Sequence, residues 1–98
     1  MQFKLIFTKL ADEQLTELEH DPCKKIVLKA VQKALTFMEC NIRHKSLQTH
    51  KFHGLSGPNK EEIFEAYVQQ HTPGAYRIFW YYGPLKNHIT IAAIVPHP

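Results

Sequence analysis

Three extended apolar runs joined by short turns fill the last third of the chain, and they constrain its fold more than any other feature. Glu61 to Gln69 alternates between two sets of side chains, Ala75 to Tyr82 is aromatic, and His88 to Val95 is rich in β-branched residues. The turns between them, at Thr72–Gly74 and Gly83–Asn87, contain glycine and proline. Strands joined by such short turns pair antiparallel, so the pattern predicts a meander.

Two amphipathic helices are predicted upstream of the meander. Leu10 to Glu19 forms a short helix with Leu15 and Leu18 inward and acids in its first turn. Asp21 then caps a second helix, which has Pro22 in its first position and continues to about Cys40. Gln2 to Thr8 alternates and adds a strand to the sheet. The expected fold is α+β: a helical hairpin packed on one face of a twisted antiparallel sheet of about four strands, in the order β-α-α-β-β-β.

The chain of 98 residues has room for one domain, residues 1–98. It contains no apolar run of the roughly 18 residues that a membrane helix needs, and its first residues do not resemble a signal peptide, so we expect a cytoplasmic protein. Cys23 and Cys40, near the two ends of the second helix, lie roughly 25 Å apart, too far for a disulfide. Neither the cysteines nor the scattered histidines have metal-ligand spacing, so no metal or other cofactor is expected.

Charge is distributed unevenly along the chain. Five of the nine acids lie between Asp12 and Asp21, whereas the chain from Pro22 to Pro98 carries ten Lys and Arg against four acids. The stretch from Asn41 to Lys60 contains no acid at all, and we expect a basic loop there, with a short strand around Lys51 to Leu55 as one possibility. A basic body behind one acidic helix favours a polyanionic partner, although a merely solvated charged face would have the same composition.

The order of these elements, followed by the segments HKFHGLSG, GAYRIFWYYG and IVPHP, resembles the RelE/ParE superfamily of toxins from type II toxin–antitoxin systems. The resemblance spans nearly the whole chain. It implies a cognate antitoxin as partner and, for RelE-, YoeB- and HigB-like members, metal-independent cleavage of messenger RNA in the ribosome, which inhibits translation. ParE-like members share the fold but poison DNA gyrase, so the target depends on the site residues. An inactive member that binds RNA or antitoxin is a third reading, and a homodimer or a hetero-oligomer with the antitoxin is the expected assembly.

Arg77 is the first candidate for catalysis. It interrupts the most hydrophobic strand, where a guanidinium is costly to bury and should face an open groove or an anion. The resemblance implies that it contacts the scissile phosphate. The alternative is a structural arginine paired with Glu65 on the neighbouring strand, and Glu65 itself would either orient Arg77 or act as a base.

Proton transfer in such a site suits histidine. The resemblance to YoeB-like toxins implies a general acid at His97, in the C-terminal tail. Lys51 and His53 share one face of an extended segment before Gly54, and either could hold phosphate, with His53 also a candidate base. Four further residues are candidates for gripping the RNA backbone, and Tyr81 could stack on a base: Arg43, His44, Lys45 and His50.

Overall fold

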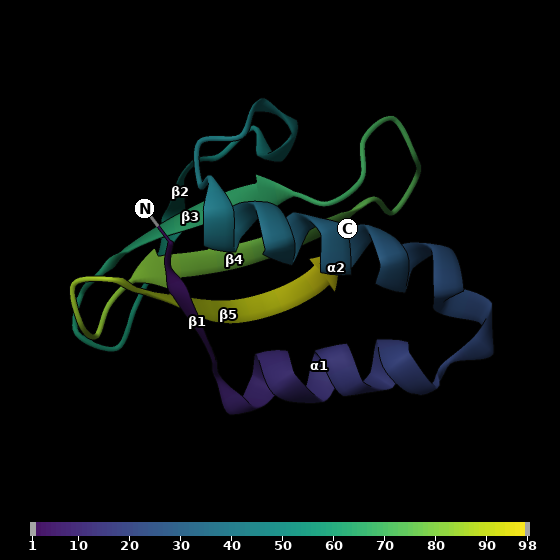
Figure 1. Ribbon diagram of the computed structural model, residues 1–98, viewed down its shortest axis with the longest axis horizontal. Coiled ribbons are helices and arrows are strands. Elements are labelled where there is room, and N and C mark those ends of the chain that lie inside the picture. Colours follow the sequence, from purple (N-terminus) through teal and green to yellow (C-terminus); the bar gives the residue numbers. More distant parts are fainter. Residues whose placement is uncertain (1, 98) are drawn as a thin grey trace.

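The computed structural model describes residues 2–97. Two helices cover one face of a five-stranded sheet (Figure 1), so the predicted α+β architecture is confirmed. The elements in chain order are β1 (Lys4–Phe7), α1 (Lys9–His20), the 3-10 turn η1 (Pro22–Lys24), α2 (Lys25–Cys40), the 3-10 turn η2 (Lys45–Leu47), β2 (His50–Ser56), β3 (Glu62–Tyr67), β4 (Tyr76–Tyr82) and β5 (His88–Pro96).

The sheet corrects the prediction in two respects. Its strand order is β1-β5-β4-β3-β2, with five strands rather than about four, because His50–Ser56 forms a complete edge strand. The sheet is also mixed rather than antiparallel, because β1 pairs parallel with β5. A long stretch of chain separates these two strands, so no tight turn forces them to run in opposite directions. The predicted meander of β3, β4 and β5 is antiparallel throughout.

The hydrophobic core lies between the sheet and the helices. From α2 it buries Val31, Ala34, Leu35 and Met38, while Val27 packs against its margin. β4 contributes Ile78 and Trp80, both fully buried. Since strand side chains alternate, Arg77 faces the side of the sheet that the helices leave uncovered, as the sequence predicts. None of the helices within residues 2–97 is long and apolar enough to cross a membrane.

The start of α1 is fastened to β5. Thr8 caps the helix, its Oγ1 accepting a hydrogen bond from the backbone N–H of Ala11 at 3.1 Å. The same hydroxyl donates to the carbonyl oxygen of Ala92 at 3.0 Å. Gln14, one turn further along, accepts from the backbone N–H of Ile94 at 2.7 Å. These contacts fix the helical hairpin against the sheet and leave the opposite face free.

Candidate functional site

Arg77 lies on β4, with Tyr67 opposite it on β3. Its guanidinium carbon is 4.1 Å from the centre of the Tyr67 ring, a cation–π contact that fixes the plane of the group. The side chain is 16% exposed, and its Nε is buried without a hydrogen-bond partner among residues 2–97. An arginine has five N–H donors, so this group retains donors for an anion in the groove.

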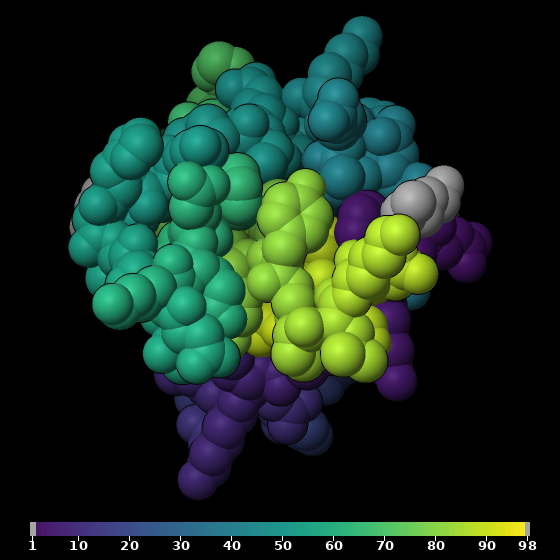
Figure 2. Space-filling model, turned by 90° about the vertical axis from the view of Figure 1, so that its left-hand side faces the viewer, coloured from purple at the N-terminus to yellow at the C-terminus, as the bar shows by residue number. Residues whose placement is uncertain are grey.

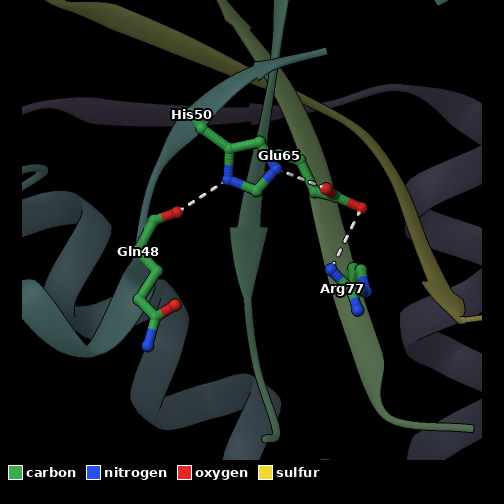
Figure 3. A network of polar contacts seen from close by, with 4 residues as sticks. All are labelled: Gln48, His50, Glu65 and Arg77. Carbon is green, nitrogen blue, oxygen red and sulfur yellow. Dashed lines mark hydrogen bonds and ion pairs between the residues drawn. The ribbon is translucent and has the colours of Figure 1, made fainter.

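Glu65 joins Arg77 to His50 in one polar network (Figure 3). One carboxylate oxygen lies 2.7 Å from His50 Nε2, and the other lies 3.5 Å from Arg77 Nη1. The Glu65 side chain is only 10% exposed, so its charge needs these partners to be stable in the sheet. Glu65 therefore has the geometry of the orienting residue, with both oxygens already engaged, rather than that of a free base.

His50 is held at both ring nitrogens. Nδ1 lies 2.8 Å from the carbonyl oxygen of Gln48, and Nε2 contacts the Glu65 carboxylate. Both neighbours accept hydrogen bonds, so the ring makes both contacts as a donor only when it carries two protons.

A cavity of about 650 Å³ opens beside this network. Arg77, Tyr67 and Gln48 form part of its wall, and His97 lies in the same cavity. His97 follows β5 and is placed by its backbone N–H, which donates to the carbonyl oxygen of Ala75 at 2.8 Å. The structure thus brings together the two residues predicted to act on phosphate and on the leaving group.

Lys51 and His53 do not line this cavity. They lie together at the β2–β3 hairpin, in a separate shallow groove. Lys51 pairs with Glu62 at 3.3 Å, and it is opposite Phe64 on the sheet, hence on the other face from Glu65. A catalytic role for either residue stays a prediction. Nowhere within residues 2–97 do three or more His, Cys, Asp or Glu side chains gather in a way that could hold a metal ion.

Arg43, His44 and Lys45 lie together around η2 and line another cavity, described below. His44 stacks on Phe37 with the ring centres 3.8 Å apart, and its Nδ1 accepts from the backbone N–H of Ser46, so this histidine also has a structural role. Tyr81 is 9% exposed, which leaves little of its ring free to stack on a base. Tyr67 is the tyrosine that lies in the Arg77 cavity.

Sequence reasoning missed the other walls of the cavity. Gln48 and the loop from Gln69 to Ala75 were not singled out, because polar loop residues carry no periodic signal. Pairing of His50 with Glu65 also escaped prediction. It depends on the register of β2 against β3, in which the two residues are direct partners.

Comparison with known proteins identifies the fold. No protein-family model matches the sequence, and no curated protein matches it at a significant level. Solved structures do match over nearly the whole chain. A YoeB dimer from Staphylococcus aureus has a TM-score of 0.64 at 17% identity and covers 100% of both chains. A YoeB/ParE toxin from Agrobacterium tumefaciens has a TM-score of 0.71 at 6% identity and covers 98% of this chain and 100% of that one.

The archaeal RelE–RelB complex from Pyrococcus horikoshii OT3 has a TM-score of 0.64 at 17% identity, covering 98% of this chain and 96% of that one. All three neighbours share the helical hairpin and sheet arrangement of this chain at the level that such TM-scores describe. The expected RelE/ParE-like fold is therefore confirmed, because the chain shares the fold of these YoeB, YoeB/ParE and RelE structures.

Proposed function

We propose that this chain, with the fold of the RelE/ParE toxins, is the toxin of a type II toxin–antitoxin system that cleaves messenger RNA on the ribosome without a metal ion. The observation that carries the proposal is the convergence of Arg77, Tyr67 and His97 on one cavity. A fold shared at low sequence identity does not distinguish a nuclease from a gyrase-binding toxin, so the choice between these two functions rests on the site residues.

In the proposed reaction the ribose 2′-hydroxyl loses its proton to water as its oxygen attacks the adjacent phosphorus, and the bond from phosphorus to the 5′-oxygen breaks. Arg77 stabilises the negative charge that develops on the phosphate oxygens, for which a planar donor group held by Glu65 and Tyr67 is suited. His97 gives a proton to the departing 5′-oxygen. The products are a 2′,3′-cyclic phosphate and a free 5′-hydroxyl.

A cognate antitoxin is the proposed partner. One of the similar structures is a complex of RelE with RelB, which supports a partner that masks the toxin. The cationic groove around Arg77 fits an antitoxin segment that carries acids. Co-expression with the product of the neighbouring gene should give a complex that survives purification at moderate salt. Failure to co-purify with any adjacent gene product would count against a toxin–antitoxin pair.

The second candidate is a ParE-like toxin that binds gyrase without catalysis. The neighbour with a TM-score of 0.71 is described as a YoeB/ParE toxin, so the fold fits this reading as well. A protein that acts only by binding has no need of a histidine beside a strand arginine. The position of His97 in the Arg77 cavity therefore favours cleavage.

Induction of the chain in cells tests the proposal directly. Messenger 5′ ends are mapped after induction, and gyrase supercoiling is assayed in parallel. We expect new message ends without added metal, and active gyrase. Arg77→Ala should lower cleavage by on the order of 100-fold or more, because it removes the group that stabilises the transition state.

His97→Ala should weaken cleavage and change its dependence on pH, since general acid catalysis contributes about 100- to 10,000-fold. His88→Ala is the matched control, because His88 lies at the start of β5, away from this cavity. Intact messages together with inhibited gyrase would favour the second candidate function, a ParE-like toxin that binds gyrase. Neither effect in a folded protein would leave the inactive, binding-only reading.

A further inference from the structure

A second cavity, of about 350 Å³, lies on the helix side of the sheet beyond the end of α2. Part of its wall is formed by Arg43, His44 and Lys45, at the start of η2. Another part is formed by three aromatic side chains of the sheet: Phe64, Trp80 and Tyr82. Figure 2 looks at the left-hand end of the view in Figure 1, with the segment after α2 at the top and the end of β4 below it. The volume lies at the lower end of the range for small-ligand sites.

The aromatic side chains that line the cavity contact one another. Phe64 stacks on Trp80 with ring centres 4.7 Å apart and planes inclined by 20°. Tyr82 stands edge-on to Trp80 at 4.9 Å, yet 46% of it is exposed. Tyr82 also contacts the rings of Phe64 at 5.6 Å and Phe3 at 6.1 Å, so it is a half-exposed part of an aromatic cluster, and a planar nucleobase can stack on such a ring.

Trp80 adds a hydrogen-bond donor that nothing else uses. The side chain is fully buried, and its indole Nε1 has no hydrogen-bond partner among the residues that the structure describes. A buried donor left unpaired is unfavourable, and an acceptor on a ligand would satisfy it if binding displaced the aromatic wall that now covers the indole N–H. Nucleobases combine a flat face with ring nitrogen and carbonyl acceptors.

The charged residues around the cavity fit the phosphate of the same ligand. Arg43 and Lys45 are exposed, and neither forms an ion pair within residues 2–97. His44 Nδ1 accepts from the Ser46 backbone, so its proton lies on Nε2, which remains a donor. Gln48 lines this cavity as well as the Arg77 cavity, so the two are neighbours around one residue.

We propose that this cavity binds one nucleotide of single-stranded RNA: its base stacks on Tyr82 and reaches the indole N–H of Trp80 as the aromatic wall opens, and its phosphate lies against Arg43 and Lys45. The inference rests on the proposed function, because the bound RNA would be the message that is cut beside Arg77. The second cavity would hold a nucleotide near the cleaved bond and so influence which sequences are cut.

Trp80 is the chain's single tryptophan, so every indole signal of the protein comes from this wall of the cavity. The full chain carrying Arg77→Ala, which removes cleavage, is titrated with a short single-stranded RNA. The indole N–H resonance and the tryptophan fluorescence are followed together. We expect the RNA to shift the resonance downfield and to change the fluorescence, because the indole donor gains an acceptor. An abasic strand with the same number of phosphates should leave the resonance in place.

Two variants locate the interaction. Tyr82→Ala should weaken RNA binding about 10-fold through the loss of stacking, whereas Leu85→Ala, an exposed apolar residue of the next turn, should not. Arg43→Gln changes an exposed side chain that the fold does not need. It should also weaken binding while the indole shift at saturation persists.

An indole resonance that does not move at saturating RNA would overturn the inference, as would the same shift with an acidic peptide of equal charge. If the unmodified chain cuts messages but RNA does not shift the indole resonance, this cavity is not an RNA site, and the proposed function still holds. If RNA shifts the indole resonance but messages stay intact, the cavity binds RNA and the proposed nuclease activity is wrong.

Discussion

At the scale of single residues, Glu65 is expected to affect both the stability of the fold and the proposed cleavage activity. Its carboxylate lies between the imidazole of His50 and the guanidinium of Arg77 and is only 10% exposed. Removing Arg77 would leave this largely buried carboxylate without its cationic partner. Because Arg77 is aimed by Glu65 and by the Tyr67 ring, a small displacement of the guanidinium would be felt in the chemistry.

Glu65→Gln should therefore affect both properties. The amide keeps the shape but presents a donor to one of two neighbours that are themselves donors. We expect a loss of about 1–3 kcal/mol in the free energy of unfolding, measured by guanidinium chloride denaturation. Cleavage by the folded variant should fall by roughly 10- to 100-fold through misplacement of Arg77.

Glu62→Gln is the matched control on the same strand. Glu62 pairs with Lys51 at the surface, with side chains 66% and 54% exposed, and such pairs contribute about 0–1 kcal/mol. Equal effects of the two substitutions would refute the orienting role of Glu65. Restoration of activity by Glu65→Asp beyond its recovery of stability would support positioning over a purely structural role.

At the scale of elements, the contact between α1 and β5 holds the helical hairpin on the sheet. Thr8→Ala removes both the helix cap and the bond to the Ala92 carbonyl. We expect a loss of about 1–2 kcal/mol in the free energy of unfolding, seen as a lower denaturation midpoint at an unchanged slope. Cleavage measured well below the unfolding transition should not change, since the Arg77 cavity lies on the other face of the sheet.

Thr36→Ala provides the comparison for Thr8. The Thr36 hydroxyl donates only to the carbonyl of Gln32, on an exposed turn of α2. Alanine is the better helix former, so this change should leave stability within about 0.7 kcal/mol of the parent or raise it. A Thr8→Ala variant as stable as Thr36→Ala would mean that the hairpin is held by apolar packing alone.

The same elements show how far sequence predicts this fold. Both helices and the three strands of the meander carry their own periodicity and turn residues, so local reasoning places them within a few residues. β2 has almost no buried side chain and hence no alternation to detect. The parallel pairing of β1 with β5 and the contact of His50 with Glu65 arise only when distant segments meet, and no local pattern encodes them.

At the scale of the whole molecule, charge is separated between two ends. In Figure 1 the acidic helix α1 lies at the bottom of the view, and the segment around η2, which carries Arg43 and Lys45, lies at the top. With a net charge of +3, the molecule would approach RNA with its η2 end first, because the field of the acids repels phosphate from α1. Both cavities described above open near that basic end, on either side of Gln48.

RNA binding should therefore depend steeply on salt, and the dependence should map to one end of the molecule. For single strands, the logarithm of the binding constant falls with the logarithm of salt by about 0.7 for each phosphate neutralised. Arg43→Gln should lower the slope by roughly that amount, since Arg43 is exposed and has no ion pair within residues 2–97. Lys9→Gln, which removes an equal charge at the start of α1, should leave the slope unchanged. Fluorescence anisotropy of a labelled RNA over a range of potassium chloride concentrations measures both. Equal slopes for the two variants would mean that net charge alone attracts the RNA, with no preferred surface.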